Sequence, residues 1–235
     1  MRVLTILAIG AILGCSDRVE KSVDPRIADA SRPLVFLTSP EEPPCAYVDA
    51  SGEIVGSNVE LAKRIAAKMG RKLVVEGVAF PQILPRLRDG AADFAISTIT
   101  ITDARRRDVD FSEPYGAGGA CFLYRAQGRK PRMSQLATVR VGVEADSSHD
   151  LYLCFCGCDP ERFDSLVDSL EALEKGEIDA VFFDAIHLRA YAEKSGGKFA
   201  VTPQVTREFY GVAVDKRRPD VLAAANAVIA EGGAK

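Results

Sequence analysis

Asp93–Tyr115, DFAISTITITDARRRDVDFSEPY, is the stretch that decides the fold. Its first residues are apolar and predict a buried strand. A run of hydroxyl side chains follows, and Arg105 then stands at the expected start of a helix; the hydroxyls belong to Ser97, Thr98, Thr100 and Thr102. This group suits a small carboxylate, because free backbone N–H groups, the helix dipole and the forked guanidinium all favour an anion. The segment therefore predicts an anion-binding edge, while Arg106 and Arg107 are expected to be solvated charges.

Strands alternate with helices upstream of this segment. Strands are expected over residues 34–37 and 72–78, and helices are expected after the N-cap Asn58 and from about Pro81. Such an alternation implies a parallel sheet with right-handed crossovers. Ligands of such sheets bind beyond the carboxyl ends of the strands, which is where the hydroxyl run falls.

The alternation begins again after the glycine-rich stretch 115–120. A strand is expected over residues 139–143, a helix after the N-cap Ser165, and a buried strand over 178–184 that ends in Asp184. This restart favours two α/β lobes over one long sheet. The glycine-rich stretch feeds a strand, whereas a phosphate-binding loop needs a helix there, so we interpret it as a hinge crossing between the lobes.

Composition excludes several classes of partner. The chain has 235 residues, of which 47% are hydrophobic and 27% charged, and its formal net charge is −3. These values are ordinary for a globular domain with a sizeable core. No basic stripe with interleaved aromatic residues is present in the sequence, so nucleic acid is not an expected partner. A small molecule or another protein is expected instead.

The amino-terminus has the pattern of an export signal. Arg2 precedes an apolar run, Val3–Leu13, that is too short to span a bilayer. The run ends in Ile12-Leu13-Gly14-Cys15, which resembles a bacterial lipobox. We therefore expect residues 1–14 to be a lipoprotein signal peptide, Cys15 to be lipidated, and residues 15–32 to be a flexible tether. An exported protein, periplasmic or at the cell surface and anchored through Cys15, follows; an ordinary secretory peptide with an incidental cysteine is the alternative.

Several short motifs occur in the order and at the spacing of one family. They are Pro43, Pro44 and Tyr47; Asp49, Gly52 and Gly56; Thr102–Arg105; Asp110–Tyr115; Val141–Val143; and Gly176–Val181 with Asp184. From Leu34 to about Asn226 the chain resembles the family 3 extracellular solute-binding proteins, the amino-acid receptors of ABC importers.

The resemblance implies a fold and a set of partners. The fold is α/β, of the two-lobe periplasmic-binding-protein type II, with hinge strands and a ligand cleft between the lobes. Lobe 1 would comprise residues 33–120 and 205–235, and lobe 2 residues 121–204. The partners would be a small solute, most simply an amino acid, and an ABC permease in the inner membrane. Neither enzymatic activity nor a cofactor is implied.

The resemblance also assigns roles at the site. Thr98, Thr100 and Arg105 would hold the ligand's α-carboxylate. Ser147 and Ser148, in a turn that opens a second-lobe helix, would help to clamp it, although Ser147 could simply cap that helix. Asp146 stands where the family has a glycine. Asp184 would accept the α-ammonium, because a buried acid needs a partner; a surface aspartate that caps the next helix is the alternative.

Two residues would face the ligand side chain. Phe80 matches an aromatic wall, and core packing is its alternative. Glu42 takes a position that is often aromatic in the family. An acid there indicates a polar or cationic side chain in the ligand, whereas a solvated loop carboxylate beside Glu41 is the other interpretation.

Cysteines depart from the family pattern. If Cys15 is lipidated, an odd number remains, which leaves at least one thiol unpaired or shared in an oxidising envelope. The five are Cys45, Cys121, Cys154, Cys156 and Cys158. The last three, with His149 upstream, offer soft ligands for copper(I) or zinc. Vicinal thiols or a disulfide are the alternative, since the spacing matches no standard zinc pattern.

Two other classes of function remain open. One is a periplasmic dehydratase-like enzyme on the same scaffold, with Glu42 or Glu144 as general acid. However, the sequence contains neither H-E-x-x-H nor G-x-S-x-G. The other is an envelope sensor or metal-handling protein that uses the Cys154–Cys158 cluster.

Overall fold

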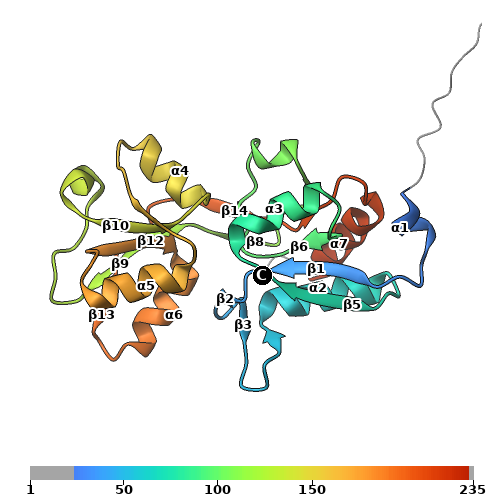
Figure 1. Cartoon of the computed structure of the whole chain (residues 1–235), viewed down its shortest axis with the longest axis horizontal. Coiled ribbons are helices and arrows are strands. Elements are labelled where there is room, and N and C mark those ends of the chain that lie inside the picture. Colours follow the sequence, from blue (N-terminus) through green and yellow to red (C-terminus); the bar gives the residue numbers. More distant parts are fainter. Residues whose placement is uncertain (1–23, 233–235) are drawn as a thin grey trace, which may run out of the picture.

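Two α/β lobes lie side by side in the computed structural model, which describes residues 24–232 (Figure 1). The expected signal peptide and Cys15 lie outside the described residues. Each lobe contains one five-stranded sheet covered by helices, so the predicted two-lobe α/β fold is confirmed. Within residues 24–232, no helix is both long and apolar enough to cross a membrane.

The first sheet contains the strand that opens Asp93–Tyr115. Its strands lie in the order β5 (Leu73–Gly77), β1 (Leu34–Thr38), β6 (Phe94–Ala95), β15 (Ala213–Val214) and β7 (Asp110–Phe111). The first three are parallel, as the strand–helix alternation predicts. β15 is antiparallel to both neighbours, because the chain returns to this lobe near its end. The sheet is therefore mixed rather than wholly parallel.

Both faces of this sheet are buried under helices. Alternate residues of a strand point to opposite faces. Leu34 and Phe36 therefore pack towards α2 (Ser57–Lys68) and α7 (Pro219–Gly232), whereas Leu37 packs towards α3 (Phe80–Arg88). This double burial explains why β1 is apolar from Leu34 to Leu37 and why β6 is apolar throughout.

The second sheet has the same plan. Its strands lie in the order β11 (Glu161–Phe163), β10 (Val141–Glu144), β12 (Ala180–Asp184), β9 (Ala120–Arg125) and β13 (Phe199–Val201). Three helices flank it, namely α4 (Ser148–Phe155), α5 (Leu166–Lys175) and α6 (Ala185–Lys194). Ser165 caps α5 as predicted, because its side chain accepts a hydrogen bond from the Asp168 amide, and Gly176 ends that helix in the left-handed conformation.

A two-stranded ribbon connects the lobes. β8 (Gly116–Gly118) pairs antiparallel with β14 (Glu208–Tyr210), in the middle of the molecule (Figure 1). The glycine-rich stretch thus forms a crossing strand, as predicted. A small meander of β2 (Glu41–Glu42), β3 (Ala46–Val48) and β4 (Ile54–Val55) lies beside the first lobe.

Two helix starts differ from the predictions. α2 begins at Ser57, with Gly56 rather than Asn58 before it. Gly56 has φ 124°, and a Cβ there would lie 2.3 Å from the carbonyl oxygen of Cys45, so only glycine fits this approach. The helix expected at Arg105 is only a 3-10 turn, η1 (Arg105–Arg107). The helix-dipole argument for an anion site at this point is therefore wrong.

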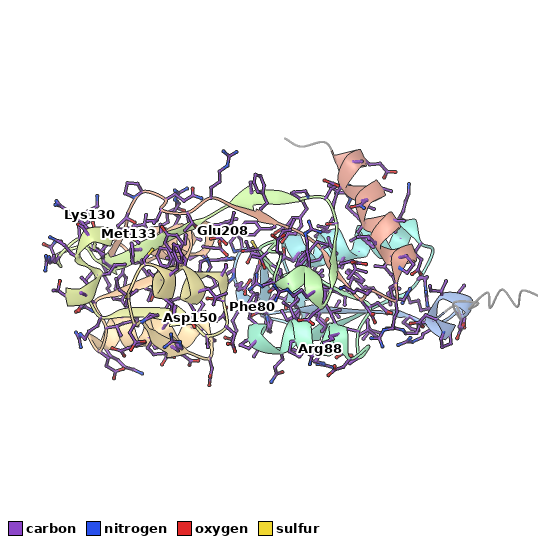
Figure 2. All side chains as sticks on the ribbon, turned by 90° about the horizontal axis from the view of Figure 1, so that it is seen from above. Phe80, Arg88, Lys130, Met133, Asp150 and Glu208 are labelled. Carbon is purple, nitrogen blue, oxygen red and sulfur yellow. The ribbon has the colours of Figure 1, made fainter. Side chains whose placement is uncertain are left out.

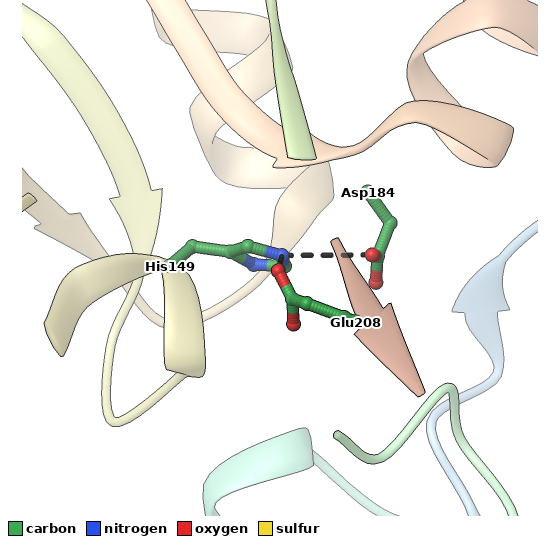
Figure 3. Close-up of side chains that lie close together, drawn as sticks. All are labelled: His149, Asp184 and Glu208. Atoms are coloured by element: carbon green, nitrogen blue, oxygen red, sulfur yellow. Dashed lines mark ion pairs between the residues drawn. The ribbon is translucent and has the colours of Figure 1, made fainter. Parts of the chain in front are cut away.

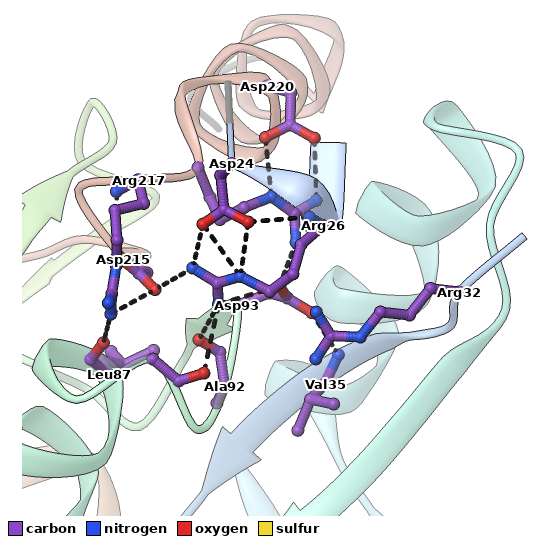
Figure 4. Close-up of polar contacts among 12 residues, drawn as sticks. Asp24, Arg26, Arg32, Val35, Leu87, Ala92, Asp93, Asp215, Arg217 and Asp220 are labelled. Carbon is purple, nitrogen blue, oxygen red and sulfur yellow. Dashed lines mark hydrogen bonds and ion pairs between the residues drawn. The ribbon is translucent and has the colours of Figure 1, made fainter. Parts of the chain in front are cut away.

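Residues 24–32, expected to be part of the flexible tether, pack against the first lobe instead. A helical turn, α1 (Pro25–Ala28), brings the Arg26 guanidinium to Asp24 at 2.7 Å and to Asp215 at 2.6 Å (Figure 4). Arg71 donates to the carbonyl oxygen of Arg32 at 2.6 Å. The tether prediction failed here because a polar segment can order when its charges find buried partners.

The end of this first sheet holds a buried ion pair. Arg218 and Asp93 have fully buried side chains and are in direct contact. Asp93 also accepts a hydrogen bond from the Val35 amide at 2.7 Å, and Arg218 pairs with Asp220 at 2.8 Å (Figure 4). Removing one member of such a pair leaves a charge that water cannot reach.

Replacing Arg218 with methionine should lower the free energy of unfolding by about 3–5 kcal/mol, because Asp93 then loses its principal counter-ion. Urea denaturation followed by circular dichroism measures this. Arg140→Met is the matched control, since it removes an ion pair with Asp179 in which the side chains are 53% and 39% exposed. That change should be small because water screens the pair. Equal losses in both variants would contradict the assignment.

Candidate functional site

One small cavity lies between the lobes, and all eight predicted ligand-binding residues line it. They are Glu42, Phe80, Thr98, Thr100, Arg105, Ser147, Ser148 and Asp184. Glu144, His149 and Phe183 line it as well. Figure 2 places Phe80 and Glu208 near the junction of the two lobes. Residues far apart in the sequence therefore converge on the interlobe space.

Arg105 is held in place but keeps free donors. Its Nη1 donates to the carbonyl oxygen of Thr100 at 3.0 Å, and its Cζ lies 5.5 Å from the centre of the Phe80 ring. That carbonyl is the only hydrogen-bond acceptor of the guanidinium among the described residues. Its remaining N–H groups are thus available to an anion. Arg106 and Arg107 are exposed, as predicted.

Phe80 lies between the cavity and the core of the first lobe. It is the first residue of α3 and packs partly against the core under the first sheet. The other part of its ring contacts the cavity.

The two serines of the second lobe differ in what they do. Ser147 caps α4, because its Oγ accepts a hydrogen bond from the Asp150 amide at 3.1 Å. Ser148 reaches across the cavity, and its Oγ lies 3.1 Å from the Oγ1 of Thr100 in the first lobe. Asp146, before them, adopts the left-handed conformation with φ 58°, which favours the glycine of the family pattern.

Asp184 ends β12 and is buried, so the alternative of a surface capping residue is wrong. It occupies the N-cap position of α6, but its side chain makes no capping hydrogen bond. Its Oδ1 instead accepts a hydrogen bond from the hydroxyl of Tyr210 and lies 3.6 Å from Nε2 of His149. Although burial acts to raise its pKa, the two histidines and the Tyr210 hydroxyl keep that pKa below the ordinary value.

Glu42 is buried, with 1% of its surface exposed, so its interpretation as a solvated loop carboxylate is wrong. Its Oε2 accepts hydrogen bonds from the hydroxyls of Ser97 and Thr98, both at 3.3 Å, and its Oε1 has no partner among the described residues. Burial raises the pKa of Glu42 well above its ordinary range, and the nearby carboxylates of Glu144 and Asp184 add to this.

Three polar residues at this site are not among the predicted ligand-binding residues. Glu144 is predicted only as a general acid for an enzyme, although it ends β10 at the same sheet edge as Asp184. His149 is predicted only as a metal ligand with the cysteines. Glu208 fits none of the motifs, yet its Oε2 accepts a hydrogen bond from Ser148 at 3.0 Å and another from Thr100. Strand-end position predicts Glu144, but only the hinge geometry identifies Glu208.

The cysteines do not form the metal cluster considered from the sequence. Cys154 lies in α4, Cys156 follows its end, and Cys158 is buried. The Sγ of Cys154 lies 3.4 Å from a carboxylate oxygen of Asp150. His149 points away from them into the interlobe cavity. Over residues 24–232, these thiols and His149 make no compact ligand group, and none of the five cysteines there forms a disulfide.

The lobes touch around the site, so the cavity is almost filled. Besides the contact between Thr100 and Ser148, Nδ1 of His187 lies 2.9 Å from the carbonyl oxygen of Pro43. The centre of a water molecule can occupy about 10 Å³ of the cavity. This volume leaves room for about one water. A solute of amino-acid size therefore needs the lobes or the side chains to move apart.

A larger cavity, of about 640 Å³, adjoins the hinge ribbon. Asn58, Tyr115 and Arg189 are among its lining residues. It shares only Thr98 with the predicted set, so the predicted residues converge on the smaller cavity.

A family model confirms the resemblance seen in the sequence. Residues 34–234 match the model of the bacterial extracellular solute-binding proteins, family 3. The chain belongs to this family. Members of it are extracytoplasmic, and the relatives that follow are amino-acid-binding proteins.

Curated relatives of this family 3 protein bind several amino acids. The L-cystine-binding protein of Escherichia coli K12 is 26% identical over 233 residues, which cover 96% of this chain and 87% of the relative. The ABC transporter arginine-binding protein 1 of the same organism is 29% identical, over 82% of this chain and 81% of the relative.

Solved structures of amino-acid-binding proteins share the fold of this chain. The arginine-bound form of ArgBP from T. maritima is 32% identical, with a TM-score of 0.80, over 84% of this chain and 95% of that chain. An ancestral arginine-binding protein bound to arginine has a TM-score of 0.81 at 28% identity, over 86% of this chain and 93% of that chain.

Glu144 should make the stability of this family 3 protein depend on pH. Burial raises the pKa of Glu144 to about 8, although His149 opposes the shift. Because the folded pKa lies above the unfolded one, the contribution of Glu144 to stability is present at low pH and is lost as pH rises to about 8.

Glu144→Gln should therefore gain stability relative to the wild type, on the order of a few kcal/mol by about pH 8 and much less near pH 5. Thermal denaturation across this range measures the difference. Glu53→Gln, at an exposed carboxylate, should show a difference that does not change with pH. A constant difference for Glu144→Gln would exclude the effect.

Proposed function

We propose that this protein is the extracytoplasmic receptor of an ABC importer and that it binds an α-amino acid between its lobes. The guanidinium of Arg105 would hold the α-carboxylate, with the hydroxyls of Thr98, Thr100 and Ser148 beside it. Asp184 would accept the α-ammonium. The observation that carries the proposal is that a guanidinium on one lobe and a buried acid on the other line the same cavity.

The ligand side chain that fits best is cationic. Glu42, Glu144 and Asp184 line the cavity, and Glu208 lies beside it, against the single guanidinium of Arg105. A zwitterion needs only one acid and one base. The further carboxylates, above all the unpartnered oxygen of Glu42, favour a second positive charge on the ligand. The arginine-binding relatives agree with this choice.

Closure of the lobes would supply the affinity. Charge-assisted hydrogen bonds contribute about 1.5–3 kcal/mol each. Several such bonds, made only when both lobes contact one ligand, shift the equilibrium from open to closed.

Binding and release would be the whole activity of this protein, in line with its solute-binding relatives. The proposed lobes are residues 33–120 with 205–235 and residues 121–204. Cys15 would carry the lipid anchor, and an ABC permease would receive the ligand. Turnover of prephenate or arogenate by the purified protein would contradict this and support the dehydratase alternative.

Arg105→Ala should lose about 3–5 kcal/mol of binding free energy, because a buried carboxylate is left without its partner. A thermal-shift screen of the twenty amino acids first identifies the ligand, and titration calorimetry then measures its affinity. Arg106→Ala is the matched control, since Arg106 is adjacent but exposed. The amine that corresponds to this amino acid without its α-carboxylate should bind the wild type and Arg105→Ala equally weakly. Unchanged affinity in Arg105→Ala would remove that residue from the site.

Binding of L-arginine near pH 7 should release protons. The pKa of Glu42 and that of Glu144 are raised, so a nearby cationic side chain lowers them and drives ionisation. Affinity should rise between about pH 6 and pH 8. Calorimetry in buffers of different ionisation enthalpy measures the protons released. L-citrulline, a neutral analogue of similar shape, should bind more weakly and release fewer; equal binding of the two would contradict a cationic ligand.

A further inference from the structure

A histidine and two carboxylates beside the cavity form a compact group. Nε2 of His149 lies 3.6 Å from Oδ1 of Asp184 and 3.7 Å from Oε1 of Glu208 (Figure 3). One ligand atom from each residue lies within 4.8 Å of the others, and this is the only such group of three or more histidine, cysteine or acidic residues in the described part of the chain.

His149 makes no hydrogen bond, and the two carboxylates are the only charged groups paired with it among the described residues. Only 4% of it is exposed, and neither ring nitrogen forms a hydrogen bond with any residue from 24 to 232. The distances to the two carboxylate oxygens are longer than hydrogen bonds. They are close to the separation of about 3.3 Å between ligands that sit 2.0–2.1 Å from one tetrahedral ion.

The two carboxylates are already oriented by hydroxyl groups. Tyr210 donates to Asp184, and Thr206 donates to Oε1 of Glu208 at 2.7 Å. Ser148 donates to the other oxygen of Glu208. Outer hydrogen bonds of this kind fix the direction of metal ligands and raise affinity.

We infer that His149, Asp184 and Glu208 bind a divalent transition-metal ion, of the kind that prefers nitrogen and oxygen donors. Imidazole with two carboxylates suits zinc and its first-row neighbours. The size of the cavity, which His149 and Asp184 line, is consistent with an ion. In the closed arrangement the cavity has room for about one water molecule, so it admits an ion but not an amino acid. Three protein ligands also leave a coordination position open.

Metal binding itself does not depend on the proposed receptor function, but one consequence does. If Asp184 accepts the α-ammonium, the ion and the amino acid need the same carboxylate, so they compete. The apparent dissociation constant for the amino acid would then rise linearly with the concentration of free zinc.

The test titrates chelator-treated full-length chain with Zn²⁺ by calorimetry and with Co²⁺ by visible absorption, without amino acid. We expect one ion per chain and the d–d bands of nitrogen and oxygen coordination. His149→Gln should weaken Zn²⁺ binding by at least about tenfold, and Glu208→Gln gives a second, independent loss. His187→Gln is the matched control, because His187 is also buried with an unpartnered Nε2 but is not in the group; it should bind Zn²⁺ as the wild type does.

A variant with Cys154, Cys156 and Cys158 all changed to serine separates the two candidate metal sites. It should retain Zn²⁺ binding. Loss of binding in this variant, unchanged binding in His149→Gln, or no stoichiometric binding in the wild type would overturn the inference. Amino-acid binding measured in chelator tests the receptor function separately, so either proposal can fail while the other stands.

Discussion

A carboxylate that is removed from water must meet a cation, accept hydrogen bonds or take up a proton. This constraint governs the space between the two lobes. Glu42, Glu144, Asp184 and Glu208 all have less than a tenth of their surface exposed, and the only guanidinium lining the cavity that they surround is that of Arg105. Burial raises the pKa of Glu42 and that of Glu144, so protonation of these two groups offsets part of the excess.

The same constraint is met differently at the far end of the first lobe. There Asp93 contacts Arg218 directly, and Arg26 comes within 3.5 Å of it. Every carboxylate of this cluster has a guanidinium partner within the fold, so the cluster stabilises the lobe and leaves no carboxylate free for a ligand. At the interlobe site, acids outnumber bases and an oxygen of Glu42 has no partner. The difference in partners separates the structural cluster from the interlobe site, where the proposed cationic ligand would meet the unpartnered oxygen of Glu42.

Much of this arrangement could be predicted from short-range patterns. Apolar strands, the Ser165 cap and the glycine crossing depend on local sequence, and the structure agrees with them. The eight predicted site residues were placed by family position, and they line one cavity. Failures have a common cause, which is that they depend on contacts distant in the sequence. Residues 24–32 are held by Asp215 and Arg71, which are distant in the sequence, and the burial of Glu42 depends on Ser97 and Thr98. No local pattern indicates that Glu208, in the returning hinge strand, meets His149.

Glu208 shows why the hinge belongs to the site. It lies on β14, one of the two crossing strands, and its Oε2 accepts hydrogen bonds from Thr100 of the first lobe and Ser148 of the second. These three groups can be joined only when the lobes approach, so the carboxylate is better solvated by protein in the closed form and by water in the open form. A cation that contacts Glu208 together with groups of both lobes would bind the closed form more tightly than the open form, and it would therefore shift the equilibrium towards closure. Whether that cation is an ammonium, a guanidinium or a metal ion, the hinge carboxylate would couple the charge of the ligand to the position of the lobes.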